Sequence, residues 1–220
     1  MAFMGKIRSY RQACNLAQAL DVVGERWTLL IVRELLLGPR RFGQLAANLV
    51  GMGTNLLADR LKELEAAGVV RKGSPEAGAK RLPYELTEEG QGLEPVLREL
   101  MRWAVRRPPT LQPEQSDAIY RDEWDLIALR LLYRPKATGA AEGVVEFATE
   151  RGGLLVRVDA TGLRVLSDPG ASPDVSLKGP QAVFEALVTG RESLHALQKK
   201  GRVKVAGDRA MARAFAAGFR

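Results

Sequence analysis

The 220-residue chain has one cysteine and one histidine, and this scarcity excludes several kinds of site. A single cysteine, Cys14, cannot form an intramolecular disulfide and is typical of a reducing compartment. His195 and Cys14 together cannot supply the ligands of a common His/Cys zinc site. A Ser-His-Asp set would depend on His195 alone, and neither a G-x-S-x-G motif nor a phosphate-binding loop ending in Lys-Ser/Thr occurs. We therefore expect no enzyme activity, no metal and no cofactor.

Long apolar runs are also lacking, because no run approaches the roughly 18 residues of a membrane span. Residues 1–12 have no apolar core of a secretory signal, so we expect a cytoplasmic protein without a membrane partner. A hydrophobic content of 46% is enough for two cores, and the length suits two domains. The net charge of +7 lies mainly in the N-terminal half, as binding to a polyanion would favour.

Residues 20–90 have the order of elements of a winged helix-turn-helix. Apolar residues at three- and four-residue spacing predict a buried helix over residues 27–37, and Gly38-Pro39 ends it. A short helix is predicted over residues 42–49, followed by the turn 51–53. This arrangement positions the next helix for the major groove of DNA.

That next helix, predicted over residues 54–67, has one apolar stripe and one polar face. Leu57, Leu61 and Leu64 form the stripe, and Thr54 is expected to be the N-cap. Such a helix fits a major groove about 12 Å wide while its stripe packs on the domain. The residues expected at the DNA are Thr54, Asn55, Ala58, Asp59, Arg60 and Lys62, together with Arg41 before the short helix.

Arg60 is the best candidate for reading a base, because a guanidinium matches the O6 and N7 atoms of guanine. The alternative is an ion pair within the helix, for which Glu63 at i+3 is the candidate partner toward the C-terminus.

A basic hairpin is predicted after this helix, with strands near residues 69–71 and 82–87 around a turn-rich loop. The cations that flank its tip are Arg71, Lys72, Lys80 and Arg81. They suit the phosphate backbone or the minor groove. The alternative is a solvated hairpin with ordinary surface cations. The position of the hairpin after a helix-turn-helix favours the interpretation that these cations bind DNA.

Residues 10–105 resemble the HxlR-type winged-helix transcription regulators, relatives of the MarR group. The matching pieces are Cys14, Gly24–Leu45, Leu57–Val70 and Tyr84–Gly90. The resemblance implies a homodimer on a pseudo-palindromic double-stranded DNA operator, with helix 54–67 as the reader and repression as the commoner mode. The chain departs from the family pattern at Gly53 and Asn55, so the operator sequence does not transfer.

Two apolar stripes are candidates for the dimer surface. The first comprises Ala13, Leu16, Ala17 and Leu20; the second comprises Leu93, Val96, Leu97, Leu100, Met101 and Ala104, with Trp103 beside it. In the family such terminal helices pair across a two-fold axis, which would place DNA half-sites roughly 34–36 Å apart. The alternative is that both helices complete the core of one protomer.

Cys14 has two interpretations. In some relatives a cysteine near this position senses oxidants or electrophiles, and Arg11 lies close enough to lower the thiol pKa. The neighbouring residues Ala13 and Ala17 favour the other interpretation, in which Cys14 packs as a small buried hydrophobe.

A proline-rich linker, residues 106–116, separates an N-terminal domain (1–105) from a C-terminal domain (117–220). The second domain is predicted to be α+β with an antiparallel sheet. Its expected helices span 117–133, 181–188, 193–199 and 208–219, and its expected strands span 143–149, 154–158, 163–166, 173–177 and 202–205. The fold class of the whole chain is therefore α+β, with a mainly α winged helix-turn-helix domain first.

The C-terminal domain resembles sterol-carrier-protein type 2, most clearly in the motif GRVKVAGD at Gly201–Asp208. The resemblance implies a slot between sheet and helices for an apolar effector. Its expected lining residues are Leu126, Phe147, Leu155, Phe184, Leu187, Phe215 and Phe219. The alternative is that these side chains fill the core and that the domain serves dimerisation or spacing.

The sequence thus predicts a dimeric, DNA-binding transcription regulator, with repression as the expected mode and an apolar ligand as modulator. The alternative from another class is a lipid or acyl carrier whose winged helix serves protein interaction. Such a carrier would copurify with lipid and show no affinity for DNA.

Overall fold

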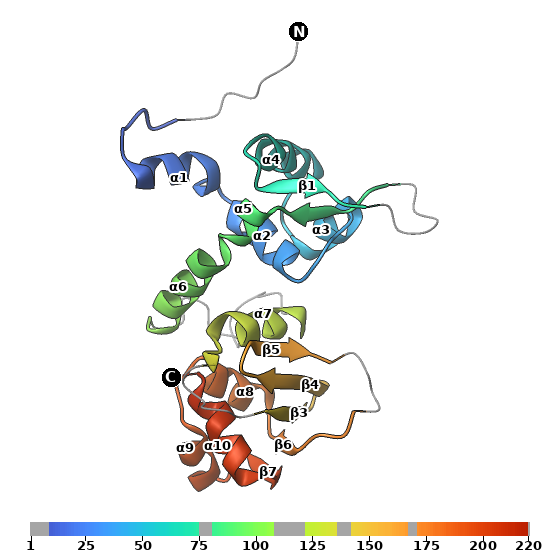
Figure 1. The fold of residues 1–220 in the computed structure, drawn as a ribbon, viewed down its shortest axis with the longest axis vertical. Coiled ribbons are helices and arrows are strands. Elements are labelled where there is room, and N and C mark those ends of the chain that lie inside the picture. Colours follow the sequence, from blue (N-terminus) through green and yellow to red (C-terminus); the bar gives the residue numbers. More distant parts are fainter. Residues whose placement is uncertain (1–8, 75–80, 108–121, 136–141, 167–170, 220) are drawn as a thin grey trace. The chain divides into compact units, whose positions relative to one another are not determined.

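The computed structural model describes residues 9–74, 81–107, 122–135, 142–166 and 171–219. The chain divides into two compact units between Leu97 and Arg98 (Figure 1). This division falls inside helix α6 (Glu94–Val105), ahead of the expected linker at 106–116, most of which lies outside the described residues. The domain limits therefore stay a prediction. None of the described helices is both long and apolar enough to cross a membrane.

The N-terminal unit has the predicted order of helices and hairpin. Its elements are α1 (Asn15–Val23), α2 (Thr28–Leu36), α3 (Phe42–Asn48), α4 (Thr54–Ala66), β1 (Val70–Lys72), β2 (Tyr84–Leu86) and α5 (Glu88–Gln91). The predicted stripe of α4, Leu57, Leu61 and Leu64, is buried, as are Ile31 of α2 and Leu45 of α3. The three helices therefore share one core, and α4 keeps its other face outward.

The cap of α4 differs from the prediction. Gly53, not Thr54, is the N-cap, with extended backbone angles of φ −66° and ψ 145°. The Gly53 carbonyl already accepts the first helical hydrogen bond from the Leu57 N–H, at 3.0 Å. Thr54 is thus the first helical residue, and its exposed side chain makes no cap.

A third extended segment joins the hairpin. The Arg40 N–H donates to the Tyr84 carbonyl at 2.9 Å, and the Tyr84 N–H donates back to Arg40 at 2.8 Å. This antiparallel bridge attaches the base of the hairpin to the segment between α2 and α3. The sequence did not indicate it, because a single bridge has no alternating pattern.

A buried carboxylate links α2 to the end of α3. Glu34 is 0% exposed, and its Oε1 accepts from the Arg33 guanidinium at 2.6 Å. Its Oε2 accepts from Asn48 Nδ2 at 2.8 Å. Because a buried charge is tolerated only with partners, this cluster specifies how the two helices pack.

The C-terminal unit is a five-stranded sheet with helices. Its elements are α7 (Asp122–Leu132), β3 (Gly143–Thr149), β4 (Gly152–Asp159), β5 (Gly162–Val165), β6 (Val175–Lys178), α8 (Gln181–Val188), α9 (Leu194–Lys199), β7 (Lys204–Gly207) and α10 (Arg209–Ala217). The strand order is β5-β4-β3-β6-β7. The α+β class is confirmed, but the sheet is not wholly antiparallel, because β6 runs parallel to β3. Alternating residues indicate a strand without indicating the direction of its neighbour.

The pairing across the sheet also shows that the last strand begins later than predicted. Leu177 lies opposite Val205 and Val175 opposite Gly207, so β7 begins two residues after the predicted start at Arg202. The carboxylate of Asp208 then caps α10 by accepting from the N–H groups of Ala210 and Met211. The chain therefore turns from strand to helix within two residues.

Helices cover one face of this sheet. Val145, Phe147 and Val156 face the core and are buried, whereas the alternate residues Arg157 and Lys178 are exposed. Five aromatic side chains occupy much of the space between sheet and helices, with paired ring centroids 4.5–5.7 Å apart. They are Tyr133, Phe147, Phe184, Phe215 and Phe219.

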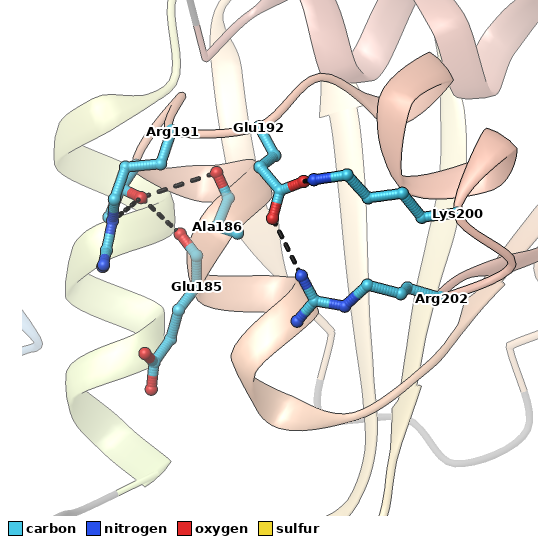
Figure 2. A network of polar contacts seen from close by, with 7 residues as sticks. Glu185, Ala186, Arg191, Glu192, Lys200 and Arg202 are labelled. Atoms are coloured by element: carbon cyan, nitrogen blue, oxygen red, sulfur yellow. Dashed lines mark hydrogen bonds and ion pairs between the residues drawn. The ribbon is translucent and has the colours of Figure 1, made fainter.

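Figure 2 shows an ion network that joins the α8–α9 connection to the segment between α9 and β7. The Glu192 carboxylate accepts from Lys200 and, at 2.8 Å, from Arg202. The hydrogen bond from Lys200, with the charges of both cations, holds the pKa of Glu192 below its usual value.

This network should make the C-terminal unit more stable at neutral pH than in acid. The pKa of Glu192 is lower in the folded chain than its ordinary value of 4.5. The stabilisation that the ionised carboxylate gives to the folded state is therefore complete above pH 4.5 and is lost as the pH falls through the folded-state pKa. The melting-temperature gap between wild type and Glu192→Gln should therefore narrow from about pH 7 to about pH 3 in thermal melts. The matched control is Glu185→Gln, whose carboxylate makes none of the contacts drawn in Figure 2. A gap of the same size at both pH values would contradict the assignment.

Candidate nucleic-acid interface

A groove of about 780 Å³ lies where α3, α4 and the β1–β2 hairpin converge in the N-terminal unit. Its lining residues are Arg41, Phe42, Gly43, Gln44, Ala58, Lys72, Arg81, Leu82 and Tyr84. The structure thus brings together predicted residues from three separate segments of the sequence. Gln44, Leu82 and Tyr84 are members that the sequence analysis did not single out.

The start of α3 supplies one cationic edge of this groove. Arg41 is the N-cap of α3, and its backbone N–H donates to Gln44 Oε1 at 2.7 Å. This bond holds the first turn of the helix in place, while the Arg41 side chain is exposed.

The hairpin supplies further cations of the groove. The Lys72 ammonium lies 3.3 Å from the centroid of the Tyr84 ring, so the ring orients the cation. Arg81 is exposed beside them. Arg71 pairs with Glu85 at 2.8 Å, which neutralises part of its charge. Lys80 lies outside the described residues.

The outward face of α4 carries most of the predicted reading residues. Thr54, Asn55, Asp59 and Lys62 are exposed, and the half-buried Ala58 forms part of the groove wall. Small and polar side chains here leave room for base edges, and amide and carboxylate groups can accept or donate there.

Arg60 is held in a different environment from these residues. Its guanidinium pairs with Glu63 on α4 and with Glu25, at 2.9 Å, before α2. Its side chain is 15% exposed. The ion pair with Glu63 that the sequence left open is therefore observed, and Glu25 is an additional partner 35 residues away. Reading a base would require these ion pairs to exchange.

Cys14 is exposed at the N-cap of α1, so its prediction as a buried packing residue is wrong for the single chain. Of α1, only Ala17 is buried. The backbone N–H groups of Ala17 and Leu16 lower the pKa of Cys14. The lowered pKa of Cys14 therefore comes from the backbone N–H groups at the start of α1 and not from Arg11. Redox sensing stays a prediction.

The C-terminal candidates separate into two groups. Leu126, Phe147 and Phe184 line a cavity of about 220 Å³. Leu187, Phe215 and Phe219 are buried in the core, where sheet and helices meet, and do not line this cavity. Leu155 alternates with the core-facing Leu154 and Val156 and so lies on the opposite face of the sheet.

Comparison with known proteins identifies the family of the N-terminal unit. Residues 22–110 match the HxlR-like helix-turn-helix family. The chain is 40% identical over 88 residues to the HTH-type transcriptional regulator YvaP of Bacillus subtilis, itself uncharacterised, and covers 82% of it with 40% of its own length. The chain belongs to the HxlR-like helix-turn-helix family.

Other relatives of this HxlR-like chain are also transcriptional regulators. It is 38% identical over 91 residues to YodB of Bacillus subtilis, with 41% of this chain and 80% of YodB covered. It is 44% identical over 89 residues to Rv3095 of Mycobacterium tuberculosis, with 40% of this chain and 56% of that regulator covered. A solved structure of reduced YodB from Bacillus subtilis is 31% identical, with a TM-score of 0.40 and coverage of 46% of this chain and 99% of YodB.

The second unit matches a different family. Residues 129–220 match the SCP-2 sterol transfer family, as the resemblance predicted. The protein therefore combines a regulator-type DNA-binding fold with a sterol-carrier-like domain.

Proposed function

We propose that this protein is a homodimeric, sequence-specific regulator of transcription that binds double-stranded DNA and acts as a repressor. One observation carries the proposal: the groove between α3, α4 and the hairpin has cations at its edges and the exposed polar turn of α4 beside it. The cations suit phosphates, and the polar face of the helix suits base edges.

The dimer is proposed from unpartnered apolar side chains on two helices. Leu16 of α1 is 67% exposed and Trp103 of α6 is 57% exposed, and Leu20, Val96 and Leu100 are also exposed. Large apolar side chains left exposed on each of these helices suit an interaction surface, and the family resemblance makes a second copy the expected partner. Cytoplasmic location is part of the same proposal.

We further propose that the C-terminal unit binds a small, mainly apolar effector. The support is the cavity lined by Leu126, Phe147 and Phe184. Occupancy of this cavity would regulate DNA affinity if it changed the spacing of the two reading helices. The rival carrier function predicts lipid binding without DNA binding.

Asn55→Ala should weaken binding to the specific operator about 5- to 150-fold, which corresponds to about 1–3 kcal/mol for one lost base contact. Fluorescence anisotropy would measure it, using an operator first selected from genomic fragments bound by the wild type. Binding to a scrambled duplex should change little, and two protomers should bind each operator. The matched control is Gln198→Ala, which removes an exposed amide from α9 in the other unit.

Each contrary result has a defined meaning. An equal loss on operator and scrambled DNA would make Asn55 a phosphate contact. A wild type that binds both duplexes equally and weakly, yet carries lipid, would overturn the regulator in favour of the carrier.

A further inference from the structure

The two cations of β1, Arg71 and Lys72, have different partners across the hairpin. Arg71 lies opposite Glu85, and its guanidinium donates to that carboxylate at 2.8 Å. Lys72 lies opposite Tyr84, and its ammonium is 3.3 Å from the centroid of that ring. Successive side chains of a strand point to opposite faces, so the two pairs lie on opposite faces of the hairpin. The carboxylate offsets the charge of Arg71, whereas the neutral ring leaves the charge of Lys72 intact.

The pair of Lys72 and Tyr84 belongs to the groove between α3, α4 and the hairpin. Both residues line the groove, and the pair of Arg71 and Glu85 does not. Within the described part of the chain, the lining of this groove contains no acidic residue. A phosphate that enters the groove would therefore meet the Lys72 ammonium without a carboxylate that competes for it.

The backbone of Tyr84 is held on both sides. It pairs with Lys72 of β1 on one side, and on the other side it exchanges two hydrogen bonds with Arg40, of 2.8 and 2.9 Å. Tyr84 is half-buried, whereas Lys72 is exposed. A lysine side chain is flexible, and ordering it opposes binding. A ring that is fixed by its backbone can order the ammonium before DNA arrives, so the bound state loses less conformational entropy.

From this geometry we infer that Tyr84 is a positioning residue for DNA, whose ring holds the Lys72 ammonium in the groove so that the ammonium binds a backbone phosphate. Tyr84 thus acts on DNA affinity through Lys72. The inference rests on the proposed DNA-binding function and adds to it a residue that carries no charge. Because a phosphate contact carries no sequence information, the effect should be the same on every duplex.

The test is a double-mutant cycle on the full chain, with binding to a fluorescein-labelled random-sequence duplex at low salt measured by fluorescence anisotropy. The variants are Tyr84→Leu, Lys72→Ala and the two combined. Tyr84→Leu should weaken binding about 5- to 12-fold for each protomer bound, because a rotamer-rich side chain would then be ordered only on binding. In a chain that already carries Lys72→Ala, the same change should have less than about a twofold effect, because the ring then has no cation to hold.

Two controls separate positioning from a damaged hairpin. Tyr84→Phe keeps the ring and should bind within about twofold of the wild type, because the cation contacts the ring face and not the hydroxyl. Arg71→Ala with Glu85→Ala removes the other cross-strand pair without changing the net charge, and it should also bind within about twofold of the wild type.

A further variant keeps the test decisive if Tyr84→Leu does not fold, as thermal melts would show. Trifluorophenylalanine at residue 84 has nearly the size of phenylalanine, but fluorine weakens the negative face of the ring. This protein should bind about 3- to 5-fold more weakly than Tyr84→Phe for each protomer bound.

Several results would overturn the inference. They are a loss from Tyr84→Leu that persists in the Lys72→Ala chain, an equal loss in the Arg71→Ala with Glu85→Ala control, tighter binding once the ring is removed, or equal binding of the phenylalanine and trifluorophenylalanine proteins. A wild type that binds no duplex would overturn this inference and the proposed function together. The expected cycle on random DNA, without preference for any operator, would support the inference and contradict the sequence-specific regulator.

Discussion

Replacing Glu34 by alanine is expected to lower the free energy of unfolding of the N-terminal unit by about 3 kcal/mol. The change leaves Arg33 and Asn48 without the carboxylate that they share in the interior. It also leaves a hole where a fully buried side chain stood. The figure is at the low end for a broken buried pair, because Arg33 is 19% exposed and can turn toward solvent.

Hydrogen exchange of peptides from α2 and α3 would measure this loss in the N-terminal unit alone. The matched control is Glu89→Ala, which removes an exposed carboxylate from α5 and should stay within about 0.5 kcal/mol of the wild type. Protection of the Glu34→Ala peptides within about 1 kcal/mol of the wild type would show that the cluster does not hold α2 to α3.

Reversing two charges at the hairpin edge, Lys72→Glu with Arg81→Glu, should weaken DNA binding at least about 100-fold at low salt. Two cations that line the groove would be replaced by two repelling carboxylates. The loss should appear on operator and scrambled DNA alike, because phosphate contacts carry no sequence information. The slope of log affinity against log salt should fall by about two, one unit for each lost phosphate contact.

The matched control reverses the same number of charges in the C-terminal unit. Lys178→Glu with Lys204→Glu changes two exposed lysines that lie opposite each other on β6 and β7. If DNA binding depends on the hairpin, this control should keep the wild-type salt slope. Equal losses in the two variants would mean that net charge alone governs binding, and the groove would lose its assignment.

Much of the N-terminal unit could be predicted from the sequence, because its signals are local. Leu57, Leu61 and Leu64 recur at helical spacing, and a single buried stripe is enough to orient α4. Glycine also marked the helix ends, because it readily adopts the left-handed backbone that follows a helix. Gly38 and Gly68 have this conformation, with φ of 122° and 73°. The prediction was wrong at the start of α4, where the adjacent residues Gly53 and Thr54 were both candidates for the N-cap and Gly53 occupies it.

Long-range partners could not be predicted in the same way. Arg60 was predicted to read a base because a guanidinium matches guanine, and Glu63 was the one ion-pair partner that helical spacing offered. Its additional partner, Glu25, lies 35 residues earlier in the chain. Cys14 was predicted to be buried because its neighbours include alanines, but Ala17 is the one buried residue of α1. In both cases the deciding contact, or its absence, involves residues far apart in the chain.

The same distinction holds for the C-terminal unit. Composition and periodicity by themselves determined that the chain has two cores, a basic helix-turn-helix unit and an α+β unit, because burial patterns repeat over a few residues. Only the tertiary structure decided that β6 lies parallel to β3, that Leu155 faces away from the helices, and that Asp125 meets Gln181 beside a small cavity. The reason is physical: hydrophobic patterning selects which face of an element is buried, whereas pairing and side-chain packing between distant segments select its neighbour.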